Sequence, residues 1–283
     1  MKTTTIFITG INSFVGSNLA LYLKKKGYIV KGSLSDLSKA HSVKNITNVL
    51  TEIKLGSDIS TQSIPDGIDV LIYAAHDKNE AKNNIESNKM LYELADKKGC
   101  RYHIFISSIS ADPSNTTDYG RVKRNLENFF RKKKNTAIIR PGLVIGAGGL
   151  YSSMESYIKK NHFIPLPDGG RYKMAIIEMT ELSKAIEMLI EKLEPGFFNL
   201  YQTQLVSLKD IVRKIALLHE KKILIVNIPV NLAMVFFGLF KKILNLLRIE
   251  NKFSIDSIAG YKLYQDLQLP PSDLKKLIEV KIQ

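Results

Sequence analysis

The stretch "TTIFITGINSFVG", residues 4–16, decides the fold of this 283-residue chain. Its first half is a short apolar run typical of a buried β-strand, and its second half turns at Gly10 and continues as a helix. Small residues at such a turn let the backbone approach a phosphate, and the free amides at the start of the helix favour its charge. The stretch therefore predicts a phosphate site between the first strand and the first helix.

The segments that follow alternate in the same way, which is typical of βαβ units that build a parallel sheet with helices on both faces. We therefore predict an α/β fold, a doubly wound parallel (Rossmann) sheet with a smaller C-terminal substrate-binding lobe. The predicted NAD(P)-binding domain covers residues 1–145, and the substrate-binding region covers 146–283 and interleaves with the first domain at about 172–200. Strands are expected at residues 4–9, 28–34, 49–54, 70–74, 103–107 and 136–140, with a short one near 175–178. A first helix ends at Gly27, and further helices are expected over 79–98, 119–133, 180–193 and 208–219.

The composition is that of an ordinary globular protein, with 45% hydrophobic and 24% charged residues. A single cysteine, Cys100, excludes an internal disulfide framework, and no cluster of His, Cys, Asp and Glu has metal-ligand spacing. The N-terminal "MKTTTIFITG" lacks the apolar core of a signal peptide. We therefore expect a cytoplasmic protein without a bound metal.

A net charge of +14 raises the question of a nucleic-acid partner. The basic residues are scattered, and no module that combines aromatic and basic residues appears, so nucleic-acid binding is not expected. The longest apolar stretch, residues 223–240, contains Asn227 and Pro229 and should split into a strand and an amphipathic helix over about 229–247. Peripheral membrane contact through this helix stays open. So does the oligomeric state, a homodimer included.

The opening turn resembles the TGxxGxxG pattern of the extended short-chain dehydrogenase/reductase family, the NAD-dependent epimerase/dehydratase-like group. Thr9, Gly10 and Gly16 match this pattern, while Ser13 stands at the middle glycine. Later stretches resemble those of the family in the same order: "LGSDIS", "DVLIYAAH", "NIESNKMLYELA", "IRPGLVIG" and "IIEMTELSKAI". The resemblance covers roughly residues 4–190 and implies that the chain binds NAD(P).

The resemblance also implies which residues surround the cofactor. They are Gly10, Asn12, Ser13, Phe14, Val15, Gly16, Ser35, Asp36, Asp58, Ile59, Ala74, Ala75, His76, Asn84, Lys123, Pro141 and Gly142. An acid that ends the second strand binds the ribose hydroxyls of NAD, but Leu34 aligns with that position and Asp36 comes two places later. Ser33, Ser35 and Lys39 suit the additional phosphate of NADP, so NADP is favoured over NAD.

The stretch "SSISADPSNTTDYGRVK", residues 107–123, holds the candidate catalytic set of Ser108, Tyr119 and Lys123. Tyr119 and Lys123 are four residues apart at the start of a helix, so their side chains project from one face. A neighbouring ammonium stabilises the phenolate that a tyrosine needs to act as acid or base near neutral pH. The hydroxyl of Ser108 can hold a substrate oxygen, and the resembled family gives its Ser, Tyr and Lys these roles. A second Tyr-x-x-x-Lys pair, Tyr22 and Lys26, lies along the outside of the first helix and is not expected to take part.

These residues predict an NAD(P)-dependent oxidoreductase, and the resemblance implies a nucleotide-sugar substrate. A 4-keto-sugar reductase and a C4 epimerase both stay open, while "ISAD" after the serine lacks the glutamate that a dehydratase normally needs. Substrate contacts are expected from His76, Ser108, Tyr151 and Arg171. Because Tyr119 comes only 11 positions after Ser108, a non-catalytic dinucleotide-binding scaffold or redox-sensing subunit remains an alternative. The apolar helix expected over about 229–247 leaves a second alternative, a reductase of a lipid or sterol-like carbonyl.

Overall fold

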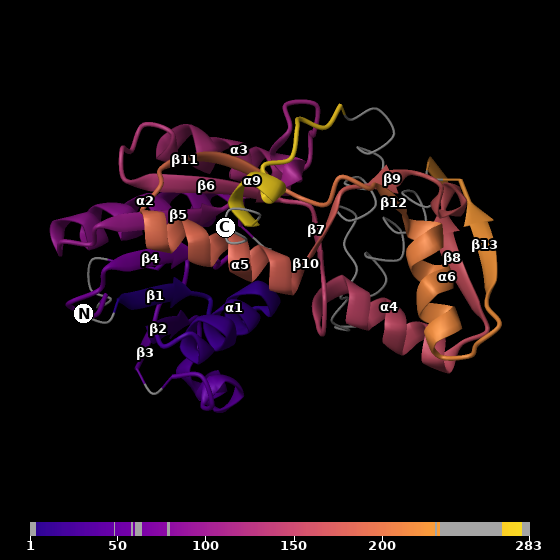
Figure 1. Ribbon diagram of the computed structural model, residues 1–283, viewed down its shortest axis with the longest axis horizontal. Coiled ribbons are helices and arrows are strands. Elements are labelled where there is room, and N and C mark those ends of the chain that lie inside the picture. Colours follow the sequence, from indigo (N-terminus) through magenta and orange to yellow (C-terminus); the bar gives the residue numbers. More distant parts are fainter. Residues whose placement is uncertain are drawn as a thin grey trace.

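The protein is described by a computed structural model over residues 4–47, 49–57, 59, 64–77, 80–229, 231–232 and 268–278. A seven-stranded sheet, parallel throughout, forms the centre of its larger part (Figure 1). Across the sheet the strands are β11 (Gly196–Leu200), β6 (Thr136–Pro141), β5 (Tyr102–Ile106), β4 (Val70–Tyr73), β1 (Thr5–Thr9), β2 (Ile29–Leu34) and β3 (Leu50–Glu52). The predicted doubly wound α/β fold is confirmed.

The strand order changes direction at β1. The chain first builds β2 and β3 on one side of β1 and then crosses over to build β4, β5 and β6 on the other side. Because every strand is parallel, the carboxyl ends of β1 and β4 lie at the same edge of the sheet. Open α/β sheets bind their ligands in the crevice outside such a switch point.

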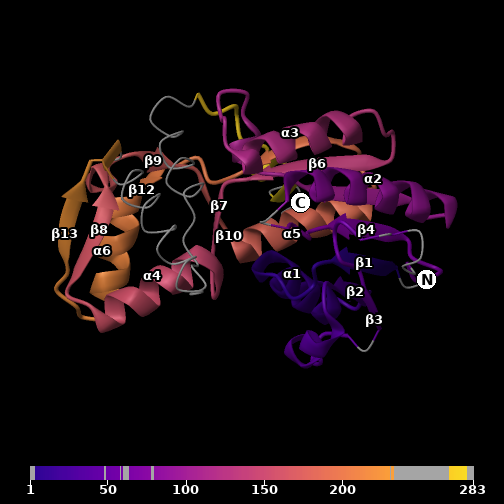
Figure 2. The same cartoon turned by 180° about the vertical axis from the view of Figure 1, so that it is seen from behind.

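Helices cover both faces of the sheet (Figures 1 and 2). One face carries α1 (Phe14–Lys25), α5 (Met179–Lys192) and the short α9 (Leu274–Ile278), and the other carries α2 (Ala81–Lys97) and α3 (Asp118–Phe130). Successive strand residues point to opposite faces, so Ile6 and Ile8 pack with the first layer and Phe7 with the second. All three side chains are buried, which explains the continuous apolar run of the first strand.

The C-terminal lobe lies to one side of the main sheet (Figure 1) and has a separate apolar cluster. Its elements are α4 (Gly149–Lys160), β8 (Phe163–Pro167), α6 (Leu208–Leu218) and β13 (Leu224–Ile228), with β13 parallel to β8. Two short pairs connect it to the sheet: β7 (Leu143–Ile145) with β10 (Ile176–Glu178), and β9 (Lys173–Met174) with β12 (Val206–Ser207). Three 3-10 turns complete the described elements: η1 (Leu37–Val43), η3 (Ile109–Ala111) and η4 (Asp168–Gly170). The two-domain division stays a prediction, although β11 and α5 return to the main sheet and its helical layer.

The six strands expected in the first half of the chain are β1 to β6, and the expected helices appear as α1, α2, α3, α5 and α6. Ser207 caps α6, since its hydroxyl accepts a hydrogen bond from the Asp210 amide at 3.1 Å. The stretch "FIPLP" forms β8, and neither this strand nor β11 was expected from the sequence. Most of the helix expected over 229–247 lies outside the described residues. Within the described part, no helix has both the length and the apolar character needed to span a bilayer.

Candidate functional site

The turn after β1 has the close packing expected of a phosphate site. Gly10 has a φ of +62°, and a Cβ added there would lie 2.8 Å from Cα of Ala75. A Cβ at Gly16 would lie 2.5 Å from the carbonyl oxygen of Gly10. Ser13, which occupies the middle glycine position, caps α1 by accepting a hydrogen bond from the Gly16 amide at 3.1 Å. The departure from the family pattern therefore has a structural role at the start of the helix.

Thr9 joins the two strands at the switch point. Its Oγ1 accepts hydrogen bonds from the amides of Ala74 at 3.1 Å and Ala75 at 3.2 Å. Ala74 and Ala75 thus lie beside Gly10, at the carboxyl ends of β4 and β1. This is the place where the sequence predicts the cofactor.

Phe14, in the first turn of α1, is covered by the glycine-rich loop before α4. A Cβ at Gly148 would lie 2.5 Å from the ring of Phe14, and one at Gly149 would lie 2.9 Å from it. The backbone at Gly148 and Gly149 thus packs directly on Phe14, next to the phosphate turn, and a side chain at either glycine would collide with the ring. Asn12 is exposed and Val15 packs against the core.

The remaining predicted cofactor residues fall into different surroundings. Asp36 accepts a hydrogen bond from the Ser38 amide at 2.9 Å, and hydrogen bonding by Ser38 lowers the pKa of this carboxyl, while Ser35 is exposed. Ile59 is buried, and Asp58 lies outside the described residues. The Asn84 amide binds the loop after β4, donating to the carbonyl of Asp77 at 2.7 Å. Pro141 ends β6, and the amide of Gly142 donates to the carbonyl of Leu200 at 3.0 Å.

The structure brings Ser108, Tyr119 and Lys123 together at the carboxyl end of β5. Ser108 follows β5 by two residues, and its hydroxyl is close enough to the Tyr119 phenol to act on the pKa of that phenol. The Nζ atom of Lys123 lies 5.7 Å from the centre of the Tyr119 ring and donates to the carbonyl of Ile106 at 2.7 Å. His76 meets the same tyrosine edge to face, with ring centres 4.9 Å apart. Of the four predicted substrate residues, His76 and Ser108 thus contact Tyr119.

Burial dominates the electrostatics of this set. It raises the pKa of the Tyr119 phenol, and the Ser108 hydroxyl acts in the opposite direction. Burial lowers the pKa of Lys123 to about 8, against the attraction of the Glu127 carboxylate. Lys123 is 6% exposed, so its proton is held in a region from which water is largely excluded. The Tyr119 phenol therefore keeps its proton near neutral pH, and the Glu127 carboxylate favours the charged form of Lys123.

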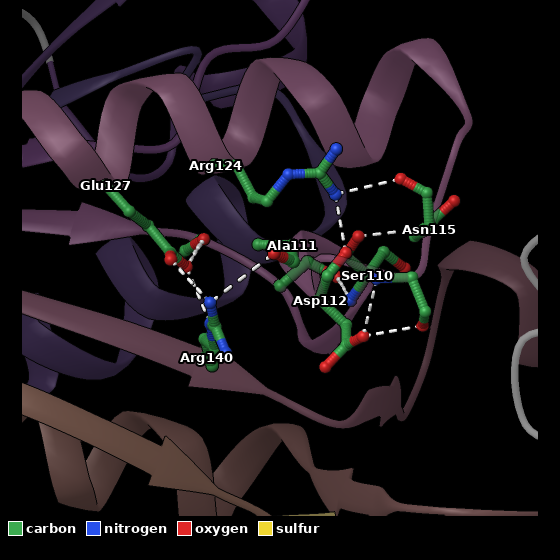
Figure 3. Close-up of polar contacts among 10 residues, drawn as sticks. Ser110, Ala111, Asp112, Asn115, Arg124, Glu127 and Arg140 are labelled. Atoms are coloured by element: carbon green, nitrogen blue, oxygen red, sulfur yellow. Dashed lines mark hydrogen bonds and ion pairs between the residues drawn. The ribbon is translucent and has the colours of Figure 1, made fainter. Parts of the chain in front are cut away.

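The short connector from Ser108 to Tyr119 is fixed by hydrogen bonds (Figure 3). Arg124 of α3 donates to the carbonyls of Asp112 at 2.5 Å and Asn115 at 2.8 Å. The buried Asn115 amide in turn donates to the carbonyl of Ser110 at 2.8 Å. Gly120 lets the loop approach the helix, because a Cβ there would lie 2.5 Å from the Ser110 oxygen. An 11-residue separation is therefore enough to bring the serine to the tyrosine.

Sequence reasoning did not identify the buried carboxylate of Glu127. Its Oε1 accepts hydrogen bonds from Ser107 Oγ at 2.5 Å and from Arg140 Nε at 2.7 Å, and its Oε2 binds a terminal nitrogen of Arg140 at 2.6 Å. A signal was present, since Glu127 lies on the apolar face of α3 between Leu126 and Phe130. A carboxylate on a buried face requires a partner, but the sequence does not say which one.

Other candidates lie elsewhere. Tyr151 packs into the apolar cluster of the lobe, and the exposed Arg171 lines a pocket of about 500 Å³ with Lys209 and Arg213 of α6. Tyr22 and Lys26 both bind the buried Glu187 of α5, at 2.5 Å and 3.5 Å. The second Tyr-x-x-x-Lys pair therefore joins two helices. Among the described residues, no three His, Cys, Asp or Glu side chains are grouped to hold a metal.

The glycine turn, the two alanines and the Ser-Tyr-Lys set thus meet at one edge of the sheet. A family model described as "NAD dependent epimerase/dehydratase family" matches residues 6–200. The chain belongs to the NAD dependent epimerase/dehydratase family. No curated protein matches this member of the family.

Solved structures show the same fold. MoeE5 in complex with UDP-glucose and NAD is 16% identical with a TM-score of 0.66, over 80% of this chain and 85% of that one. The UDP-glucose 4-epimerase of Thermotoga maritima with UDP-glucose is 17% identical with a TM-score of 0.67, over 80% and 86%. The structure titled gox2253 is 18% identical with a TM-score of 0.70, over 98% and 93%. At these identities the likeness to the epimerase/dehydratase family structures establishes the fold alone.

Proposed function

We propose that the protein is an NAD(P)-dependent oxidoreductase that reduces or epimerises a nucleotide sugar at a carbonyl or carbinol carbon. The observation that carries the proposal is the meeting of Ser108, Tyr119 and Lys123 beside the glycine turn, at the carboxyl edge of the sheet. The substrate class is favoured by two of the similar structures, MoeE5 and the UDP-glucose 4-epimerase of Thermotoga maritima, which are both complexes with UDP-glucose.

The residues at the first turn fit a dinucleotide. Gly10 and Gly16 have no room for a Cβ, which keeps the turn between β1 and α1 tight. The N-terminal amides of α1 would then face a pyrophosphate bound at this turn. NAD(P) supplies or accepts the hydride. Lys123 would bind the ribose hydroxyls, and the NAD(P)-binding region would comprise residues 1–145 together with the returning segment at about 172–200.

The proton is handled by the chain itself. In the reducing direction the hydroxyl of Tyr119 gives its proton to the carbonyl oxygen as the carbon receives the hydride, which leaves an alcohol and a phenolate. The ammonium of Lys123 stabilises this phenolate, and Ser108 holds the substrate oxygen. In the oxidising direction the phenolate takes the proton back, so the same set serves a C4 epimerase.

Substitution of the tyrosine tests this proposal. In Tyr119→Phe we expect turnover of a keto-sugar nucleotide, followed as NAD(P)H consumption, to fall by about 10²-fold or more because the proton donor is lost. Binding of NAD(P)H, measured by fluorescence, should persist. Tyr22→Phe is the matched control, since it removes the phenol of the other Tyr-x-x-x-Lys pair and should leave turnover unchanged.

Full activity of Tyr119→Phe would contradict the catalytic assignment. Stoichiometric NAD(P)H binding without turnover of sugar nucleotides or apolar carbonyls would instead favour the dinucleotide-binding scaffold. Turnover of apolar carbonyls alone would favour the lipid reductase.

We propose NADP as the preferred cofactor. Asp36 uses its carboxylate on the Ser38 amide at the start of η1, and the exposed Ser35 follows β2 directly, which supports a site for a phosphate. Titration with both cofactors should show tighter binding of NADPH than of NADH. Tighter binding of NADH would contradict this preference.

A further inference from the structure

Glu127 and Arg140 form a buried ion pair (Figure 3). The side chains of Glu127 and Arg140 are 3% and 15% exposed and are joined by two hydrogen bonds, at 2.6 Å and 2.7 Å. Both partners also bind the segment that carries the serine: Glu127 accepts from Ser107 Oγ at 2.5 Å, and Arg140 donates to the carbonyl of Ala111 at 3.4 Å. The pair therefore connects β6 and α3 to the residues on either side of Ser108.

The same carboxylate lies one helical turn after Lys123. Residues four apart on a helix are neighbours, so the charge of Glu127 acts on the buried ammonium. Lys123 is enclosed by the carbonyl of Ile106 at 2.7 Å, the Phe105 ring at 5.0 Å and the Tyr119 ring at 5.7 Å. The ionisable groups around it are thus Tyr119 and Glu127 on its own helix, Arg140 from β6 behind Glu127, and His76 on the far side of the tyrosine.

We propose that Glu127 and Arg140 are positioning residues of the candidate catalytic set. Glu127 keeps the proton on Lys123 by offsetting its buried charge. Arg140 orients that carboxylate and ties it to the backbone next to Ser108. Neither residue is proposed to touch the substrate, and the role in turnover rests on the proposed function.

The sign of a pKa change separates this role from general support of the fold. Glu127→Gln removes the attractive charge and leaves Arg140 unneutralised, so the pKa of Lys123 should fall by about one unit or more. A merely loosened site would admit water and move this pKa upward, toward its ordinary value of 10.5. Nuclear magnetic resonance of ¹³C-labelled lysine measures it, with the Lys123 signal assigned from its loss in Lys123→Met.

Activity gives a second readout. At a pH near 8 the fraction of Glu127→Gln with a charged Lys123 is smaller, so NAD(P)H affinity and kcat/KM should both fall by several-fold to tenfold. When NAD(P)H affinity is plotted against pH, the midpoint of its loss at alkaline pH should shift to lower pH by the same amount as the pKa of Lys123. Lowering the pH should recover much of the lost affinity, which a damaged fold would not allow.

Glu93→Gln is the matched control. Glu93 of α2 forms an ion pair at 2.8 Å with Lys133, which follows α3. Unlike the Glu127–Arg140 pair, this ion pair is partly exposed. This variant should leave both the pKa of Lys123 and the midpoint of the alkaline loss of NAD(P)H affinity unchanged. A pKa of Lys123 in Glu127→Gln that is unchanged or raised overturns the proposal.

If Glu127→Gln does not fold, a second comparison tests the same proposal, between Arg140→Gln and the double variant that also carries Glu127→Gln. Arg140→Gln leaves Glu127 unneutralised and should raise the pKa of Lys123, and adding Glu127→Gln to it should lower this pKa again. Equal values in the single and double variants overturn the proposal. Because the resonance measurement needs no cofactor or substrate, it remains decisive if the wild-type protein has no turnover and the proposed function fails.

Discussion

Acidification should destabilise the protein through His103, a buried histidine of β5. The side chain is fully buried, its Nδ1 lies 2.9 Å from the Tyr73 hydroxyl, and its ring lies 4.4 Å from that of Tyr92. Its Nε2 has no hydrogen-bond partner among the described residues. A proton added to this ring would therefore place an unsatisfied donor and a charge in the core.

The magnitude follows from the pKa in the two states. Burial lowers the pKa of His103 from 6.5 to about 4, so the unfolded chain binds a proton in a pH range where the folded protein does not. Stability is full above pH 6.5 and is lost as the pH falls toward 4. A difference of about 2.5 between the two pKa values corresponds to about 3 kcal/mol, at 1.36 kcal/mol per unit.

Urea unfolding followed by circular dichroism between pH 7 and pH 4 measures this loss. The variant His103→Asn keeps a polar partner for Tyr73, and its asparagine does not titrate. Between pH 7 and pH 4 its free energy of unfolding should therefore fall by about 3 kcal/mol less than that of the wild type. His41→Asn, which removes an exposed histidine, should retain the acid sensitivity of the wild type. A difference between wild type and His103→Asn that stays constant with pH would refute the reasoning.

Two glycines give further predictions. Gly10→Ala should weaken NAD(P)H binding by about tenfold or more, because the new side chain adds backbone strain of about 1–3 kcal/mol in the left-handed region and a close contact with Ala75. Gly27 also has a positive φ, but no other atom lies within 4 Å of a Cβ added there, so Gly27→Ala should leave NAD(P)H binding intact in the same titration. Gly120→Ala should push the Ser110 carbonyl away from α3, lowering the unfolding free energy by about 1–3 kcal/mol in urea and reducing turnover. For the second variant, Gly99→Ala is the open-space control, and equal turnover in the two variants would contradict the role of the connector.

The central strands could be predicted because they are buried on both faces and therefore consist mainly of apolar residues. β11 and β8 could not, for two different reasons. The stretch "GFFNL" is too short to be distinguished from a loop, and it becomes a strand by pairing with β6. β8 contains Pro165 and Pro167, which predict a break, but its sheet has only two strands, so one of its edges has no neighbour in that sheet and prolines are tolerated there.

The candidate site divides in the same way. The spacing of Tyr119 and Lys123 is a property of one helix, so the sequence alone predicts that they share a face. Their contact with Ser108 depends on the connector, whose length suggested an altered geometry. The structure shows that Arg124 and Asn115 draw this loop against α3, and such bonds between loop backbone and helix side chains leave no periodic signal in a sequence.

The ion pair behind the set shows where sequence reasoning stops. Glu127 is recognisable as a polar residue on a buried helix face, and Arg140 as a charged residue at the end of a buried strand. Each is costly to bury alone, and together they satisfy one another and the backbone beside Ser108. Replacing both by apolar residues of similar size would be tolerated by the fold, since buried ion pairs seldom add net stability. The presence of this buried pair is therefore better explained by the negative charge that Glu127 places near Lys123 than by a contribution to stability.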